Sequence, residues 1–324
     1  MIVSLKATVL SAFRLLIQLV LVLLLVWGLL TLSPMDPLNV YLGGNVFGVS
    51  AEQQANLVRE LGLHMPAGER LWQWLVAAVH GELGYSTLFR QPVAEVIEQR
   101  LPLSLLLMAL AWSGSLVLGY LLGLVAALRQ DSWLDKTIRR CAWGLSAIPP
   151  FWLGMLFISL FAVALHWLPV CCAAPPGLDF SEQPLYSKLT HLLLPVLTLM
   201  LVHMSPVILH TREKVLDVLG SEFVAYARMH GESRAGIISF HVLKNSMVPA
   251  LVLQLASLAE LFGGSVLAET LFAFPGMGQA LVNAALAQDT ALLMAGTMIS
   301  ALIIFAGNVL ANLLAGELMT GGEH

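Results

Sequence analysis

EFVAYARMHGESRAGIISFHVLKNSMVP, residues 222–249, is the longest polar interval between apolar segments in the C-terminal half of the chain. It carries the basic residues Arg228, Arg234 and Lys244, and Gly231 lies inside it. Apolar runs precede and follow it. A polar, basic insert between two membrane spans is typical of a segment that contacts something in the cytoplasm.

The composition places the chain in the membrane class. Of 324 residues, 58% are hydrophobic and only 11% are charged, and the mean hydropathy is +0.83. A soluble domain carries about 25% charged residues. The net charge of -4 gives no sign of a nucleic-acid partner, and three cysteines are too few for a disulfide scaffold.

Six apolar runs are long enough for a bilayer, which an α-helix crosses in about 20 residues. The expected spans are 15–35, 101–128, 143–166, 189–211, 250–271 and 290–316. The alternative for the first run is a secretory signal, whose apolar region is about 7–15 residues long. The first run is longer, and Thr31-Leu32-Ser33-Pro34 is a poor cleavage site. We therefore expect an all-α, polytopic membrane protein with six transmembrane helices.

The polar segments divide the chain into three parts. Residues 1–35 hold the N-terminus and the first span. Residues 36–100 form an extramembrane subdomain of short helices, in which Ser50 is placed to cap a helix. Residues 101–324 form the membrane core and contain the polar loop 212–249.

The distribution of Lys and Arg predicts the orientation. With the N-terminus inside, eleven of the 16 basic residues fall in inside segments, and the outside segments are longer. Both termini and the loop 212–249 are therefore expected in the cytoplasm, and residues 36–100 on the outer, periplasmic side.

The loop itself predicts two helices joined by a sharp turn. Residues 222–230 continue as a helix from Arg212, Gly231 ends it at the C′ position, and Ser233 caps a second helix. Ile237, Phe240 and Leu243 recur on one face. Pro249 is expected to begin the next span. Pattern alone leaves a docking element and a membrane-surface amphipathic helix equally open.

The sequence contains none of the catalytic motifs considered below. There is no phosphate-loop motif, and His80-Gly-Glu-Leu-Gly84 does not have the spacing of a zinc protease. The segment after Gly144 lacks the second glycine of a nucleophile elbow, and Ser146 has no evident base. No catalytic residue is expected.

The loop resembles the EAA loop of permease subunits of ATP-binding cassette (ABC) importers, specifically the dipeptide, oligopeptide and nickel branch. The resembling parts are Glu222-Phe-Val-Ala-Tyr-Ala-Arg-Met-His-Gly231 and His241-Val-Leu-Lys-Asn-Ser-Met-Val-Pro249. Matches elsewhere extend the resemblance over nearly the whole chain. They are Pro34-Met-Asp-Pro37, Gly81-Glu-Leu-Gly-Tyr-Ser86, Glu98-Gln-Arg-Leu-Pro102, Ser146-Ala-Ile-Pro-Pro-Phe-Trp-Leu-Gly154, Trp167-Leu-Pro169, Glu269-Thr-Leu-Phe-Ala-Phe-Pro-Gly-Met-Gly278 and Asp289. The chain departs from the pattern at Ala225, where the name-giving glutamate would stand, and at Met229-His230, which replace Ala-Lys.

The resemblance implies a type I ABC importer permease fold in a bacterial inner membrane. It implies a second homologous permease, two ATP-binding subunits and an extracytoplasmic solute-binding protein as partners, with ATP on the partner subunits and no cofactor on this chain. The loop's short helix would dock in a groove of an ATP-binding subunit. The coupling residues implied are Ala227, Gly231, Glu232, Ser233, Arg234, Ile237 and Phe240. Glu269 and Asp289 would shape the outer gate and the contact with the binding protein.

Ionisable groups inside the spans give the best indication of the cargo. Burying such a group in the bilayer costs free energy, and these groups tend to face a transport pathway. Glu260, in a setting that resembles nickel permeases, and His203, flanked by Met200 and Met204, are the candidates. Each has a structural alternative: a helix–helix hydrogen bond for Glu260, a backbone hydrogen bond for His203 and core packing for the methionines. Cys171 and Cys172 are weak candidates for a soft metal, because two cysteines do not make a site.

The sequence thus favours import of nickel or a related metal or metal chelate by alternating access. The alternative cargo is a di- or oligopeptide. The alternative from another class is an ATP-independent channel or secondary carrier, which would not need the loop.

Overall fold

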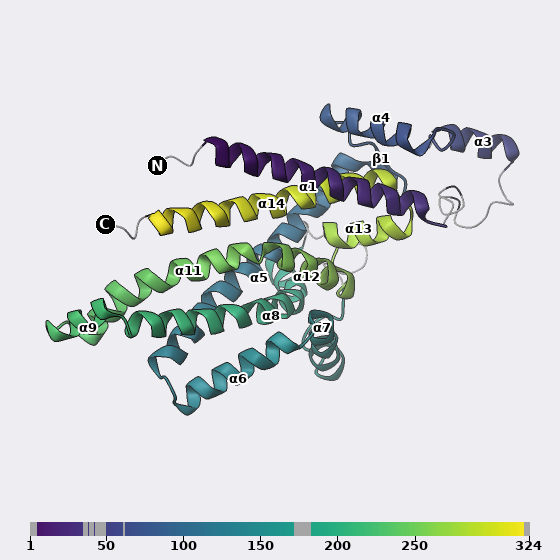
Figure 1. Cartoon of the computed structure of the whole chain (residues 1–324). Helices are drawn as coiled ribbons and strands as arrows, with labels where there is room; N and C mark the ends of the chain where they lie inside the picture. The colour runs from purple at the N-terminus through teal and green to yellow at the C-terminus, as the bar shows by residue number, and fades with distance from the viewer. Residues whose placement is uncertain are drawn as a thin grey trace. The chain divides into compact units, whose positions relative to one another are not determined.

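The computed structural model describes residues 5–34, 38, 42, 50–60, 62–171 and 183–320. Helices make up nearly all of the secondary structure in these ranges (Figure 1). Two compact units are present: Met1–Leu103 with Gly276–Phe305, and Ser104–Pro275 with Ala306–His324. The long helices α5 (Val93–Leu128) and α14 (Thr290–Thr320) each pass from one unit into the other.

The first unit contains the beginnings of α5 and α14. Its remaining elements are α1 (Leu5–Leu32), α3 (Ala51–Glu60), α4 (Ala67–Val79), β1 (Tyr85–Ser86), β2 (Gln91–Pro92) and α13 (Met277–Leu286). Ser50 caps α3 as expected, because its hydroxyl accepts from Gln53 N while the Gln53 side chain accepts from Ser50 N. The strands pair antiparallel, Tyr85 with Pro92 and Ser86 with Gln91.

Two apolar clusters hold this unit together. In one, Val93 and Val96 of α5 pack with Met277 of α13 and Leu292 of α14. In the other, Leu23 and Trp27 of α1 pack with Met294 of α14. Residues of the subdomain expected at 36–100 therefore pack with α1, α13 and the beginning of α14 in these two clusters.

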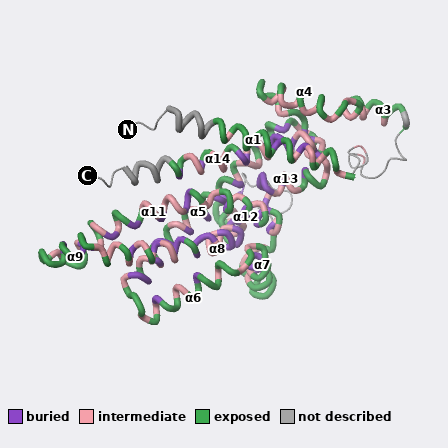
Figure 2. Tube along the Cα trace, viewed as in Figure 1, coloured by how far each residue is buried: buried purple, intermediate pink, exposed green. Residues whose placement is uncertain are grey.

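The second unit is built around α8 (Leu185–Leu219), which has buried residues along most of its length (Figure 2). The helices α6 (Trp133–Ala147) and α11 (Leu243–Ala256) pack against it. The other elements are α7 (Pro150–Phe157), the π-helix η2 (Ile158–Ala164), α9 (Glu222–Met229), α10 (Arg234–Gly236), the π-helix η4 (Ile237–Val242) and α12 (Leu258–Leu271).

Glycines let α5 approach α8 closely. A Cβ at Gly123 would lie 2.7 Å from the Ile208 carbonyl oxygen and 2.8 Å from Thr211 Cβ. At Gly119, four residues earlier, it would lie 2.9 Å from Val207 Cβ. This small-xxx-small spacing is the one by which membrane helices bring their backbones together.

By length and apolarity, five helices in the described ranges can cross a membrane, or six if one bent pair counts as a span. The five are Phe13–Leu32, Val93–Leu128, Leu185–Leu219, Arg234–Ala256 and Thr290–Asn312. The all-helical, polytopic architecture is therefore confirmed.

The expected third span, 143–166, corresponds to a bent pair of helices that begins earlier, at Trp133. Trp133–Ala147 and Pro150–Ala164 meet at 104°. The cause is local: Ile148 precedes a proline and is extended, with φ -91° and ψ 123°. Pro150 then begins α7, where the missing N–H has no cost.

The expected start of the fifth span at Ala250 is wrong. The helical path begins at Arg234 and runs through η4 and α11 to Ala256, so Pro249 lies inside α11. After Ser257, α12 begins at Leu258. Proline is more frequent inside membrane helices than inside soluble ones, so the rule that it marks a helix start fails here.

Candidate functional site

The loop after α8 forms the expected two helices and turn, with one difference. The first helix does not continue from Arg212, because α8 ends at Leu219 and α9 begins separately at Glu222. The α9 C-terminus is a Schellman motif: Gly231 N donates to Arg228 O and Glu232 N to Ala227 O, each at 3.1 Å. Gly231 is at C′ with φ 81°, a conformation that favours glycine. This prediction is confirmed.

Ser233 begins the second helix as predicted. Its hydroxyl accepts a hydrogen bond from Gly236 N at 3.1 Å. The helix passes at once into the π-helix η4, whose i→i+5 hydrogen bonds place residues five apart above one another.

The π-helix changes which side chains share a face. Ile237 and Val242, five residues apart, are both buried and pack with Val215 of α8 and Val224 of α9. Phe240 points elsewhere and is 71% exposed. The predicted common face of Ile237, Phe240 and Leu243 is therefore wrong, because it assumed the 3.6-residue period of an α-helix.

The seven predicted coupling residues fall into three groups by burial. Ala227 and Ile237 are buried and anchor the loop to its own unit. Glu232 is half-buried, with Oε2 3.0 Å from His241 Nε2. Gly231, Ser233, Arg234 and Phe240 are exposed, and Arg234 Nη2 donates to the Leu128 carbonyl oxygen at 3.2 Å.

Two further exposed side chains belong to this surface and were not predicted. Tyr226 and Met229 of α9 are 61% and 78% exposed, and the Tyr226 ring stacks on His230 with centroids 4.0 Å apart. We call Tyr226, Met229, His230 and Phe240 the loop tip. The sequence did contain an indication of this surface. Apolar residues in a polar loop that do not pack in its core are free to contact a partner.

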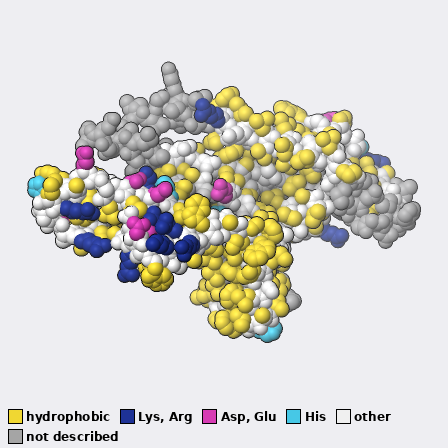
Figure 3. All heavy atoms as spheres, turned by 60° about the horizontal axis from the view of Figure 1, so that its bottom comes forward, with side chains coloured by type: hydrophobic (Ala, Val, Ile, Leu, Met, Phe, Trp, Pro, Cys, Tyr) yellow, Lys and Arg dark blue, Asp and Glu magenta, His cyan; other side chains and the backbone are white. Residues whose placement is uncertain are grey.

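A buried ion pair supports α8 shortly before the loop. Arg212 donates through Nε and Nη2 to the two carboxylate oxygens of Asp135 at 2.6 and 2.8 Å, and Asp135 has no exposed side-chain area. Lys and Arg side chains gather at the end of this unit that carries α9 and the start of α6, while hydrophobic side chains cover α7 and η2 (Figure 3).

The proposed pathway residues differ in burial. His203 and Met204 are buried, and His203 Nδ1 lies 2.9 Å from the Leu199 carbonyl oxygen. Met200 packs so close to α5 that a Cβ at Gly114 would lie 2.6 Å from its sulfur. Glu260, by contrast, is exposed on α12.

The geometry offers no assembled metal centre in the described ranges, where no three His, Cys, Asp or Glu groups lie together. Cys171 is exposed, and Cys172 lies outside the described residues. His203 adopts the packed, carbonyl-bonded arrangement that was its structural alternative.

In the first unit, two residues from separate family motifs, Ser86 and Asp289, are hydrogen-bonded to each other. Asp289 is 1% exposed and accepts hydrogen bonds from Ser86 Oγ at 2.5 Å and Leu88 N at 3.0 Å. Its other oxygen accepts from Leu292 N at 3.1 Å and so caps α14. Asp289 thus pins the β1–β2 hairpin to the start of α14.

Several helices that are long and apolar enough to span a membrane, together with a polar two-helix loop, are typical of a transport permease. The family described as "Binding-protein-dependent transport system inner membrane component" matches residues 119–318, and the chain belongs to it. It is the permease subunit of an ABC importer, from the branch that contains the peptide permeases.

Similar proteins cover nearly the whole chain. It is 34% identical over 291 residues to a putative peptide transport system permease protein of Brucella abortus (strain 2308), covering 90% of both chains. It is 30% identical to the oligopeptide transport system permease protein AppB of Bacillus subtilis (strain 168), covering 87% of this chain and 88% of the relative. It is 29% identical to the dipeptide transport system permease protein DppB of Escherichia coli (strain K12), covering 90% and 91%.

These similarities confirm the ABC importer permease predicted from the motifs. They also favour the alternative cargo, a peptide, over nickel, because the relatives are named for peptides, oligopeptides or dipeptides.

Proposed function

We propose that the chain moves short peptides inward across the membrane by alternating access. The observation that carries the choice of cargo is similarity over about nine-tenths of the chain to permeases named for peptides. Two structural observations support it: no three metal-ligating groups lie together in the described ranges, and His203 Nδ1 is already paired with a backbone carbonyl.

ATP hydrolysis takes place on two separate subunits, which dock at the loop tip. The exposed side chains of Tyr226, Met229 and Phe240 provide the apolar contact. Val224, Ile237 and Val242 are buried against α8, so a force on the tip is transmitted to the membrane helices. In this arrangement both termini and the loop tip are cytoplasmic, and ATP is bound by the partner subunits.

A second homologous permease covers the exposed carboxylate of Glu260. Ionisable groups at membrane depth face a bundle interior or a water-filled cavity. Glu260 lies on the surface of this chain alone, so the pathway is completed by another chain. A solute-binding protein delivers the peptide from outside.

Docking is tested by Phe240→Ala, with Trp133→Ala as the matched control. Both aromatic side chains are more than two-thirds exposed, but Trp133 is on α6, outside the loop. Phe240→Ala is expected to reduce co-purification of the ATP-binding subunits about tenfold, the effect of losing about 1.4 kcal/mol. Trp133→Ala leaves co-purification unchanged. Full retention after Phe240→Ala would remove the loop tip as the docking site.

The cargo is tested with the complete importer in liposomes. ATP-dependent accumulation is expected for a labelled dipeptide or tripeptide and not for nickel. Nickel accumulation without peptide uptake would overturn the peptide assignment. The pair Glu260→Gln and Glu213→Gln adds a second comparison, since both carboxylates are exposed and Glu213 lies on α8. If nickel were the cargo, Glu260→Gln would lower nickel accumulation more than peptide uptake.

A further inference from the structure

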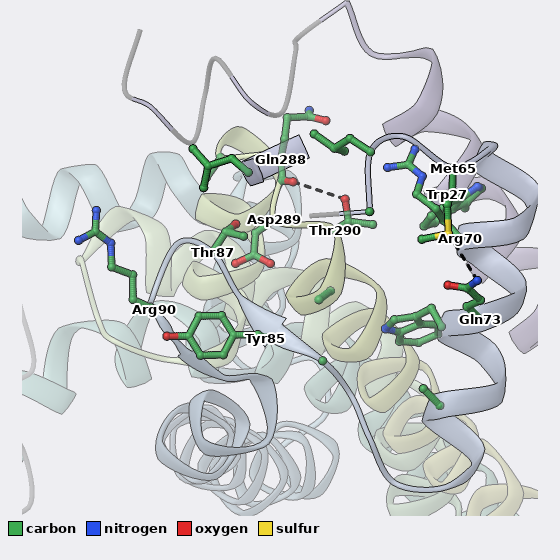
Figure 4. A pocket seen from close by; sticks show the side chains of 18 residues that line it. Trp27, Met65, Arg70, Gln73, Tyr85, Thr87, Arg90, Gln288, Asp289 and Thr290 are labelled. Atoms are coloured by element: carbon green, nitrogen blue, oxygen red, sulfur yellow. Dashed lines mark hydrogen bonds between the residues drawn. The ribbon is translucent and has the colours of Figure 1, made fainter. Parts of the chain in front are cut away.

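A cavity of about 820 Å³ lies within the first unit, and every residue that lines it belongs to that unit. Figure 4 shows it between the hairpin residues Tyr85 and Thr87 on one side and Trp27, Arg70 and Gln73 on the other. Its volume falls in the range of about 300–1,000 Å³ that is typical of small-molecule sites.

Arg70, on α4, is the unsatisfied group in the cavity wall. Its guanidinium carbon lies 5.5 Å from the centre of the Trp27 ring. Its Nε is buried and has no hydrogen-bond partner within the described part of the chain. No carboxylate in those ranges lies within salt-bridge distance of Arg70. A buried donor without a partner indicates a missing ligand or water, and a guanidinium fits a carboxylate best.

The one acidic group in the wall does not replace that ligand. Both oxygens of Asp289 already accept hydrogen bonds, from Ser86 and Leu88 on one side and from Leu292 on the other. Asp289 also caps α14, so its own carboxylate occupies this helix N-terminus. Arg70 and Arg90 line the cavity together with this single aspartate, so its charged lining residues are net positive.

The remaining lining suits an apolar molecule with amide groups. Trp27, Trp74 and Met65 supply apolar surface. Gln73 has only a weak contact, in which its amide nitrogen donates to Met65 Sδ at 3.5 Å. Thr87 adds a hydroxyl group.

We propose that this cavity is a binding site for the C-terminal carboxylate of a short apolar peptide, with Arg70 as the carboxylate-binding residue. The preference for a carboxylate follows from the cavity, whereas the choice of a peptide rests on the proposed cargo. Because Trp27 lies on α1 and Arg70 on α4, a bound peptide joins the first membrane helix to the extramembrane subdomain.

The test is calorimetric titration of the complete importer in lipid nanodiscs, without binding protein or ATP. The probes are N-acetyl-trileucine and its C-terminal amide, which differ only in the carboxylate. The acid is expected to bind at least tenfold more tightly than the amide. Equal affinity, or no saturable binding of the acid, would overturn the proposal. This comparison needs no substitution, so it does not depend on how a variant folds.

Substitution of Arg70 then tests whether it is the residue that binds the carboxylate. Arg70→Gln is expected to weaken binding of the acid at least tenfold and to abolish the difference between acid and amide. Arg59→Gln is the matched control, because Arg59 is an exposed arginine of the same subdomain that does not line the cavity. An unchanged acid–amide difference in Arg70→Gln would contradict the role of Arg70.

A third probe, decanoate, separates peptides from other apolar carboxylates. Binding of N-acetyl-trileucine but not decanoate supports the peptide site, and binding of decanoate alone overturns it. The two proposals fail separately. Peptide uptake without binding here removes only the cavity site, and binding here without peptide uptake removes only the proposed cargo.

Discussion

Arg212 of α8 and Asp135 of α6 form a two-fold hydrogen-bonded ion pair, with donor–acceptor distances of 2.6 and 2.8 Å. Arg139 Nε adds a third contact to the same carboxylate at 3.3 Å. The aspartate is fully buried and the arginine is 13% exposed. The pair therefore fixes α6 to α8 beside the path that leads into the loop.

Arg212→Met is expected to destabilise the protein by about 3 kcal/mol, since it leaves a buried carboxylate without its main partner. Lys214→Met is the matched control. It breaks the exposed Lys214–Asp217 pair, which is worth less than about 1 kcal/mol. Thermal unfolding in detergent measures both. Equal shifts in unfolding temperature would show that the Asp135–Arg212 pair contributes no more to stability than the exposed Lys214–Asp217 pair.

Asp289→Ala is expected to loosen the hairpin and the start of α14, at a cost of about 2 kcal/mol for a lost helix cap and a lost charge-assisted hydrogen bond. The readout is hydrogen exchange at Leu88 N and Leu292 N, the two amides that donate to Asp289. Asp217→Ala, at an exposed aspartate, leaves both amides protected. Unchanged exchange after Asp289→Ala would refute the pinning role.

Gly123→Ala and Gly144→Ala are expected to act in opposite directions. At Gly123 the added methyl would lie 2.7 Å from a carbonyl oxygen of α8, so the helices must separate at a cost of about 1–3 kcal/mol. At Gly144 it meets no atom within 4 Å, and replacing a helical glycine stabilises by up to about 1 kcal/mol. The unfolding temperatures of the two variants measure both effects. If Gly144→Ala destabilised the protein and Gly123→Ala did not, the packing described would be contradicted.

Local signals in the sequence predicted the turn well. The conformation at Gly231 and the cap at Ser233 each depend on a few neighbouring residues, and the structure has both. The apolar runs predicted the helical membrane class for the same reason, because crossing a bilayer requires an uninterrupted apolar stretch. Family motifs then identified the importer permease.

Features that depend on distant or unusual geometry were not predictable. The π-helix turns Phe240 away from Ile237, and a pattern with the α-helical period cannot register it. Ser86 and Asp289 meet across 203 positions, so their motifs gave no sign of contact. The cavity around Arg70 likewise draws on α1, α4, the hairpin and α14.

The most direct test of the coupling role is ATP-dependent peptide uptake by the importer that carries Gly231→Asp. Gly231 has φ 81°, and a Cβ there meets no atom of this chain within 4 Å. The chain has room for the side chain, so the new charge acts mainly on a docked partner, with about 1–2 kcal/mol of backbone strain. Gly231→Asn, which tolerates this backbone and adds no charge, is the control.

Uptake should be abolished by Gly231→Asp and largely kept by Gly231→Asn, with membrane insertion of both variants unchanged. Normal uptake with Gly231→Asp would contradict coupling through the loop and would favour an ATP-independent carrier.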